Sequence, residues 1–167
     1  MNDLILKIEQ WANDRNLIDG CTPLDQTMKL FSEFGELADA VGKNDLEGIK
    51  DGIGDVFVVL TIMCRQYEFC IGENLSSNDH LPLLDIKRLV IYILTALVDW
   101  ANGLGNFDLE LALAGLPQVA KHYNLTLQEC VEHSYNEIKD RKGVMYNGQF
   151  VKSTDSQYES ILEKLKK

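Results

Sequence analysis

Apolar residues recur every three or four positions along most of the 167-residue chain. This spacing places them on one face of an α-helix, as with Leu4, Ile8 and Trp11 in the first periodic segment. Clusters of Gly, Asn, Asp and Pro separate the periodic segments and indicate turns. The pattern predicts helices over residues 3–15, 23–41, 46–69, 82–103, 108–122 and 126–142, followed by a short helix from residue 157. The expected fold class is therefore all-α, a helical bundle.

Local signals mark where several of these helices begin and end. Thr22 followed by Pro23 is typical of a capped start, because proline at the first helical position loses no hydrogen bond. Gly42 is expected to end that helix, Asp45 to cap the next one and Gly143 to end the sixth. The short connection makes the second and third helices antiparallel neighbours.

Acidic residues recur on these two helices. Glu33 and Glu36 share a face of the second helix, because positions three apart are neighbours. Asp51 and Asp55, four apart, share a face of the third. Asp55 opens an apolar run typical of a buried helix, and a buried carboxylate must be paired or bind a metal. The cluster predicts a site for Mg²⁺, which takes oxygen ligands; the alternative is a solvated acidic face.

A second candidate group lies at the end of the sixth helix. Asn136, Lys139 and Arg141 fall within two turns there, in an otherwise acidic chain. Cations and an amide placed opposite a metal cluster can hold phosphate oxygens. The alternative is that the cations only complement the dipole at the helix C-terminus. The following residues, 144–156, are expected to form an extended arm over the site or over a neighbouring subunit.

Composition narrows the function classes. The chain is 46% hydrophobic, enough for one core, and its net charge is −10. Such an acidic protein is not expected to bind a nucleic-acid polymer, although a single nucleotide can bind where cations offset its phosphates. The longest apolar runs are too short to span a bilayer, so a soluble, cytoplasmic protein is expected. The cysteines lack Cys-x-x-Cys spacing and are expected to be reduced. His122 and His133 together make only a weak zinc motif.

The chain is expected to form one domain over residues 1–152, with a tail helix over residues 153–167. The helical hairpin over residues 29–70 has a counterpart of similar length over residues 88–123, which lacks most of the acids. This second hairpin, inserted at about residues 73–125, is either a degenerate copy or a coincidence. As a copy, it would line the back of the site or replace a partner subunit.

Three segments carry a resemblance to a known family, namely 29–40 (KLFSEFGELADA), 51–56 (DGIGDV) and 136–143 (NEIKDRKG). They are similar to the MazG-like nucleotide pyrophosphohydrolases of the all-α NTP pyrophosphatase superfamily, which also contains the dimeric dUTPases. The resemblance covers about residues 24–72 and 126–152. It implies hydrolysis of a (deoxy)nucleoside triphosphate to the monophosphate and pyrophosphate, with Mg²⁺ as cofactor and Mn²⁺ as a substitute. It also implies a homodimer or homotetramer.

The first motif of that family is Glu-Glu-x-x-Glu. Glu33 and Glu36 match its second and third acids, whereas Ser32 replaces the first. The resemblance therefore implies that Glu33 and Glu36 are catalytic residues and metal ligands. One of them would accept the proton of the attacking water.

The second motif is Glu-x-x-Asp. Asp55 matches its last acid and is implied as a catalytic residue and metal ligand, but Gly52 stands where the family has glutamate. Asp51, one turn before Asp55, is expected to supply the missing oxygen. These departures leave two other hypotheses open: a catalytically inert nucleotide-binding or regulatory relative, and a structural helical bundle that mediates protein contacts. The base and sugar are not predicted. Trp11 and Trp100 are candidates to stack on a base, but a place in the core is the expected role of each.

Overall fold

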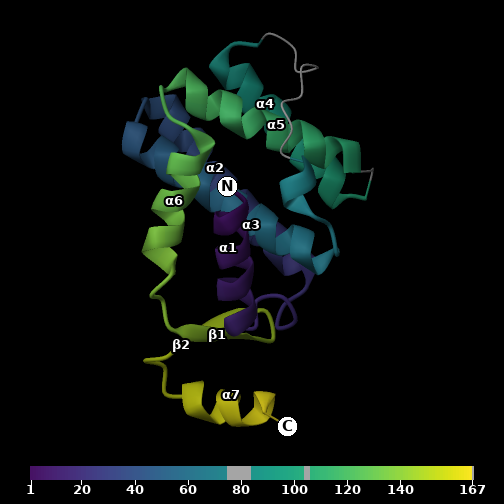
Figure 1. Ribbon diagram of the computed structural model, residues 1–167, viewed down its shortest axis with the longest axis vertical. Coiled ribbons are helices and arrows are strands. Elements are labelled where there is room, and N and C mark those ends of the chain that lie inside the picture. The colour runs from purple at the N-terminus through teal and green to yellow at the C-terminus, as the bar shows by residue number, and fades with distance from the viewer. Residues whose placement is uncertain (75–83, 104–105, 167) are drawn as a thin grey trace.

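The computed structural model describes residues 1–74, 84–103 and 106–166. Within these ranges the chain is mostly helical, which confirms the all-α expectation (Figure 1). The elements are α1 (Asn2–Asp14), α2 (Pro23–Lys43), α3 (Leu46–Gln66), the 3₁₀ turn η1 (Ile71–Asn74), α4 (Ile86–Ala101), α5 (Asn106–His122), α6 (Leu127–Ile138), β1 (Gly143–Tyr146), β2 (Gln149–Lys152) and α7 (Tyr158–Leu165). No helix among the described residues is long and apolar enough to cross a membrane.

Helix α3 lies at the centre of the fold. It packs against α1, α2, α5 and α6, and every residue of 52–64 except Asp55 is buried, which confirms the predicted buried helix. Full burial of a side chain such as Phe57 stabilises the fold by about 1.5–3 kcal/mol. The helix ends at Gln66, three residues before its predicted end, because Glu68 turns the chain with a left-handed φ of 56°.

Helices α2 and α3 are antiparallel neighbours, as the short connection predicts. Thr22 caps α2 in a reciprocal arrangement with Asp25, and Asp45 caps α3 by accepting a backbone N–H at 3.3 Å. Helix α2 extends past Gly42, which was expected to end it. Asn44 ends it instead, in the left-handed conformation that asparagine tolerates.

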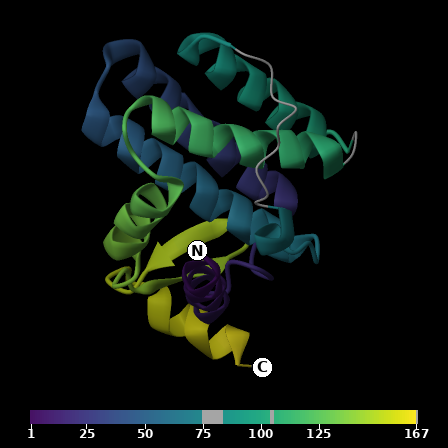
Figure 2. The ribbon, with the colours of Figure 1, turned by 45° about the horizontal axis from the view of Figure 1, so that its top comes forward.

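Helices α4 and α5 form the expected second hairpin. They pack against each other, with α4 contacting α2 and α5 contacting α3 and α6 (Figure 2). Helix α4 begins at Ile86 rather than at 82, because the side chain of Asp85 accepts a backbone N–H at 3.1 Å and caps it there. The predicted start of this helix at residue 82 lies outside the described residues.

Helix α6 ends earlier than the sequence predicts. Its last residue is Ile138, and Gly143 begins a strand instead of ending the helix. The guanidinium of Arg15 donates hydrogen bonds to the carbonyls of Lys139 at 3.0 Å and Arg141 at 2.7 Å. These contacts from α1 satisfy carbonyl groups at the end of α6 and fix the direction in which the chain leaves the helix.

Strands β1 and β2 pair in antiparallel fashion, as an extended arm after α6. Asn147 and Gly148 form the turn between them, with φ values of 49° and 76°. The Met145 N–H donates to the Arg15 carbonyl at 2.7 Å. The Gly148 N–H donates to the Gly20 carbonyl at 3.0 Å. The hairpin is thus held beside α1 and the connection from α1 to α2, with α7 packed against β1 (Figures 1 and 2).

Candidate active site

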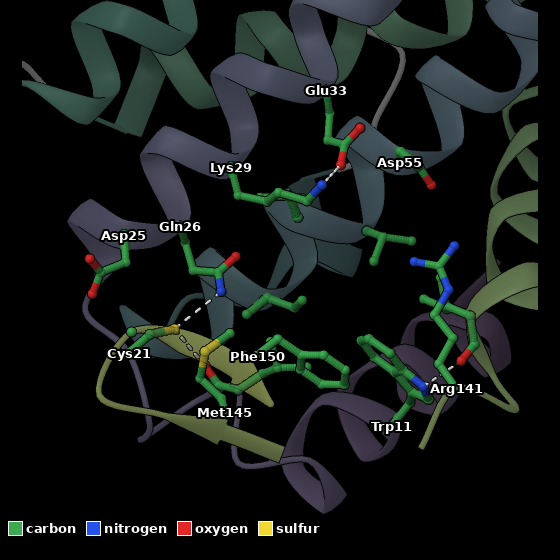
Figure 3. Close-up of a pocket in the computed structure, with 16 residues that line it drawn as sticks. Trp11, Cys21, Asp25, Gln26, Lys29, Glu33, Asp55, Arg141, Met145 and Phe150 are labelled. Carbon is green, nitrogen blue, oxygen red and sulfur yellow. Dashed lines mark hydrogen bonds and ion pairs between the residues drawn. The ribbon is translucent and has the colours of Figure 1, made fainter. Parts of the chain in front are cut away.

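A cavity of about 400 Å³ lies between α2, α3, the end of α6 and the β-hairpin (Figure 3). Helix α2 supplies Gln26, Lys29 and Glu33, which are three and four residues apart and so share one face. Helix α3 supplies Asp55 and, one and two turns further on, apolar residues of the same face. Because the two helices are antiparallel, the charged residues of both lie at one end of the cavity, and the residues that they contribute to the other end are mostly apolar.

Two acids and a guanidinium lie at the charged end. Glu33 is 5% exposed and forms an ion pair with Lys29, one turn before it. Asp55 faces the same space from α3, and Arg141 approaches it from the turn after α6 (Figure 3). Burial, followed by the negative charges of Asp51 and Glu33, raises the pKa of Asp55 to about 6. Carboxyl groups that repel each other in a half-buried place favour a bound cation, because it removes their repulsion.

The other end of the cavity is lined mainly by apolar side chains. Met145 and Phe150 reach it from the β-hairpin, and the indole ring of Trp11 reaches it from α1 (Figure 3). Trp100 lies elsewhere, edge to face with Tyr67 at a centroid distance of 5.6 Å. None of the described residues of α4 and α5 lines the cavity. The described part of that hairpin therefore does not form the back of the site, contrary to one expectation.

Glu36 and Asp51 lie beside the cavity rather than in it. Both line a separate hollow of about 430 Å³ along α2 and α3. Glu36 is exposed, whereas the Oδ1 atom of Asp51 is buried and has no hydrogen-bond partner within the described structure. The charge of Asp51 acts on Asp55, and the charge of Glu33 acts on both. The fold thus couples Glu33, Asp51 and Asp55 electrostatically and leaves Glu36 on the outer surface.

The three residues predicted to hold phosphate do not share one place. Arg141 lines the cavity, whereas Asn136 and Lys139 do not. The last two are exposed and bound to each other, with Lys139 Nζ donating to Asn136 Oδ1 at 2.7 Å. The roles assigned to these residues and to the four acids stay predictions.

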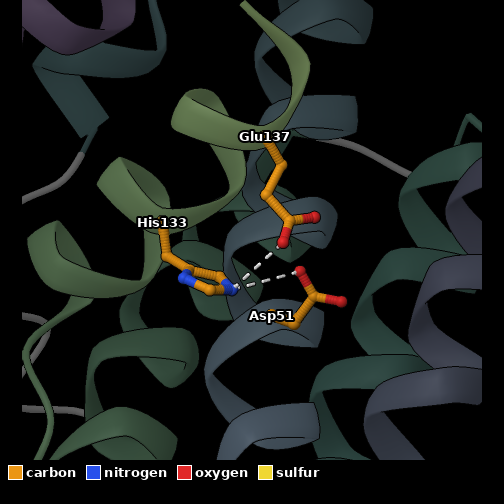
Figure 4. Close-up of side chains that lie close together, drawn as sticks. All are labelled: Asp51, His133 and Glu137. Carbon is orange, nitrogen blue, oxygen red and sulfur yellow. Dashed lines mark ion pairs between the residues drawn. The ribbon is translucent and has the colours of Figure 1, made fainter.

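Sequence reasoning missed a cluster formed by Asp51, His133 and Glu137 (Figure 4). His133 Nε2 lies 3.7 Å from Asp51 Oδ1 and 3.7 Å from Glu137 Oε1. One ligand atom of each residue lies within 4.8 Å of the others, so the three could hold a divalent cation. An imidazole nitrogen beside two carboxylates suits Zn²⁺ or Mn²⁺ better than Mg²⁺. The four-residue spacing of His133 and Glu137 was a visible signal, but only the approach of α6 to α3 adds Asp51.

Gly54 explains how α6 comes so close to α3. A Cβ atom at this position would overlap Ser134 Oγ and the Cys130 carbonyl, so a residue with a side chain would force the helices apart. At this contact Ser134 Oγ donates to the Asp51 carbonyl at 3.2 Å. The contact fixes Asp51 next to His133.

Comparisons with known proteins identify the family. Residues 22–78, which include α2 and α3, match the model of the MazG nucleotide pyrophosphohydrolase domain. An uncharacterized 18.2 kDa protein in the rep-hol intergenic region of Haemophilus phage HP1 (strain HP1c1) is 35% identical over 156 residues, covering 79% of this chain and 96% of the relative. The chain belongs to the MazG nucleotide pyrophosphohydrolase family. No solved structure matches it significantly.

The MazG domain implies the all-α NTP pyrophosphatase fold, in agreement with the helices described above. Its matched segment contains both helices that carry the acids. A MazG domain suggests nucleotide pyrophosphohydrolase activity, and members of the family are typically metal-dependent. The clustered carboxyl groups of this chain agree with that requirement.

Ionisation of Asp55 is expected to destabilise the metal-free protein at neutral pH. Its pKa is raised from 3.8 to about 6, so the folded protein holds this proton more tightly than the unfolded chain. The resulting stability is complete below pH 3.8 and is lost as the pH rises through about 6. In EDTA, the melting temperature should therefore fall more steeply between about pH 4 and pH 7 in the wild type than in Asp55→Asn, which does not titrate. The control Asp140→Asn, at an exposed position, should keep the wild-type dependence of melting temperature on pH. Equal slopes for the wild type and Asp55→Asn would refute this account.

Proposed function

We propose that this protein hydrolyses a (deoxy)nucleoside triphosphate to the monophosphate and pyrophosphate, with Mg²⁺ as its cofactor and Mn²⁺ as a substitute. The observation that carries the proposal is the two-part cavity, with Glu33, Asp55 and Arg141 at one end and mainly apolar side chains at the other. A nucleoside triphosphate has the same two parts, a charged phosphate chain and a base with apolar faces. Membership of the MazG family supports the same reaction.

The metal is proposed to bind among four acids, Glu33, Glu36, Asp51 and Asp55. All four offer carboxylate oxygens, which are the ligands that Mg²⁺ takes in proteins. The electrostatic coupling of Glu33, Asp51 and Asp55 supports this donor set, whereas the buried Oδ1 atom of Asp51 faces His133 at 3.7 Å. When bound, the cation would offset phosphate charge and lower the pKa of a water molecule.

A carboxylate of this acidic group is proposed to accept the proton of that water. Water attacks the α-phosphorus, the bond from this phosphorus to the oxygen that bridges the α and β phosphates breaks, and pyrophosphate leaves. Glu33 or Glu36 accepts the proton of the water. Glu33 is the better placed of the two, because it is buried and lines the cavity whereas Glu36 is exposed.

Cationic and amide groups are proposed to hold the leaving phosphates. Arg141 lines the cavity and would offset charge on the β and γ phosphates, together with Asn136 and Lys139. Lys29 also lines the cavity, and its side chain is 58% exposed although it pairs with Glu33. Its long stem would let the ammonium move to a phosphate once a cation replaces it beside Glu33.

The protein is also proposed to form a homodimer or homotetramer. Leu24 and Met28 support this, because they lie one turn apart on α2 with 69% and 56% of their surfaces exposed. Adjacent exposed apolar side chains on one helix can form part of a surface that another subunit covers. Analytical ultracentrifugation is expected to give the mass of two or four copies, and a monomer at all concentrations would contradict the proposal.

Pyrophosphate release from a panel of common and modified nucleoside triphosphates tests the proposed reaction. The wild type should release pyrophosphate with Mg²⁺ or Mn²⁺ and should release none in EDTA. Nucleotide binding without turnover of any substrate would favour the inert relative, the hypothesis that Ser32 and Gly52 motivate. If neither nucleotide nor metal binds, the structural bundle is the better account.

A further inference from the structure

Gln26 is a buried polar residue that the proposed reaction leaves unused. It is 4% exposed and lines the cavity from α2, seven residues before Glu33 on the same face of the helix. Met145 and Phe150 enter the cavity beside it from the β-hairpin (Figure 3). A carboxamide among such apolar groups needs a hydrogen-bonding partner, because burying it unpaired costs free energy.

The protein itself gives this carboxamide a weak partner. Gln26 Nε2 donates to Cys21 Sγ at 3.1 Å, and sulfur is a weak acceptor. Gln66 offers a contrast at its nitrogen only: Nε2 donates to the backbone carbonyls of Ile18 and Cys21 at 3.2 and 3.1 Å, while its Oε1 is buried and has no hydrogen-bond partner among the described residues. The side chain of Gln66 therefore holds the connection between α1 and α2 in place through hydrogen bonds. The carboxamide oxygen of Gln26 points away from Cys21 (Figure 3).

The separation of Gln26 and Glu33 suits the two ends of a nucleotide. The seven residues from Gln26 to Glu33 span about 10 Å along the helix axis. In a nucleotide, the distance from the edge of the base to the α-phosphate is comparable. An α-phosphate held between Glu33 and Asp55 would therefore place the base beside Gln26. The faces of the base would then lie against apolar side chains such as Phe150.

We infer that Gln26 reads the edge of the nucleobase, with Oε1 accepting a hydrogen bond from a base N–H group while Nε2 stays on Cys21. The inference rests on the proposed function. It makes Gln26 a specificity-determining residue, and it defines the substrates as nucleotides whose base presents an amino group or ring N–H at this edge. A base without that donor would leave Oε1 unpaired and would bind less well.

The variant Gln26→Met tests the inference, since methionine has a similar length but no comparable hydrogen-bonding group. For the preferred nucleotide, kcat/KM is expected to fall about tenfold, mainly through a higher KM. The preference for that nucleotide over the poorest one should fall by the same factor. Gln128→Met, at an exposed position on α6, should keep the wild-type values. An unchanged preference in Gln26→Met would overturn the inference.

A second measurement uses the wild type and so does not depend on the folding of a variant. In EDTA, the nucleoside of the preferred substrate should quench the fluorescence of Trp11, which lines the cavity, with a Kd about tenfold lower than that of an analogue lacking the N–H donor. Equal affinities would overturn the role of Gln26 and leave the hydrolysis standing. If the protein hydrolysed no nucleotide but still bound the nucleoside more tightly than the analogue, the role of Gln26 would be supported and the proposed function would be overturned.

Discussion

Replacing Glu33 with glutamine is expected to lower Mg²⁺-dependent turnover by about 10²–10⁴-fold in a protein that remains folded. Glu33 is 5% exposed and shares the charged end of the cavity with Asp55, so its loss would remove a proposed metal ligand and the proposed proton acceptor. Glutamine has the same shape, and Lys29, at 58% exposure, can turn to water once its partner is neutral. Steady-state kcat and the melting temperature of Glu33→Gln, measured side by side, check this expectation.

Glu47→Gln is the matched control for that variant. Glu47 lies in the first turn of α3, is exposed and does not line the cavity. The control should keep turnover within about twofold of the wild type, because removing an exposed carboxylate outside the site changes little. If Glu33→Gln behaved like Glu47→Gln, the assignment of Glu33 to the site would be wrong.

Gly52→Glu, which introduces the glutamate that the resemblance implies at this position, is expected to destabilise the protein severely rather than raise its activity. A Cβ atom at position 52 would lie 2.9 Å from the Cα and Cβ atoms of Leu37 on α2, closer than such atoms pack. The rest of the glutamate would also bring a charge into the contact between α2 and α3. The expected loss is more than about 3 kcal/mol of unfolding free energy, or roughly 10 °C in melting temperature. Turnover should fall too, because the same two helices carry the acids.

Replacing Gly35 and Gly52 with alanine in turn separates the cost of overpacking from the gain in helix propensity. Gly35 also lies in a helix, α2, but no atom lies within 4 Å of the position its Cβ would take. Gly35→Ala should stabilise the protein by about 1 kcal/mol, whereas Gly52→Ala should destabilise it by about 1–3 kcal/mol. Chemical denaturation measures both. A Gly52→Glu variant with wild-type stability and higher activity would show that position 52 faces the metal instead of α2.

The helices could be predicted where the deciding interactions are local. Thr22 and Asp45 cap α2 and α3 through backbone groups three residues away, so the sequence placed both helix starts correctly. The end of α6 could not be predicted in this way. It depends on Arg15, more than 120 positions earlier, whose guanidinium donates to the carbonyls of Lys139 and Arg141.

The candidate site was predictable in part for the same reason. Helical spacing and the antiparallel pairing of α2 and α3 were enough to bring Glu33 and Asp55 to one cavity, but they did not reveal that Glu36 and Asp51 line a separate hollow. The apolar end of the cavity was not predictable, because Phe150 reaches it from a hairpin that is anchored to the connection between α1 and α2. The group of Asp51 and His133 depends on how closely α6 approaches α3, and the spacing within either helix does not reveal that distance.

Acids on α2 and α3 are proposed to direct water to the α-phosphorus of a nucleoside triphosphate. Hydrolysis of the nucleotide panel in ¹⁸O-labelled water with Mg²⁺, followed by mass spectrometry of the products, tests this proposal most directly. The account predicts ¹⁸O in the nucleoside monophosphate, unlabelled pyrophosphate, and no products in EDTA. A nucleoside diphosphate with inorganic phosphate, label in the pyrophosphate, or no Mg²⁺-dependent product from any nucleotide would contradict it.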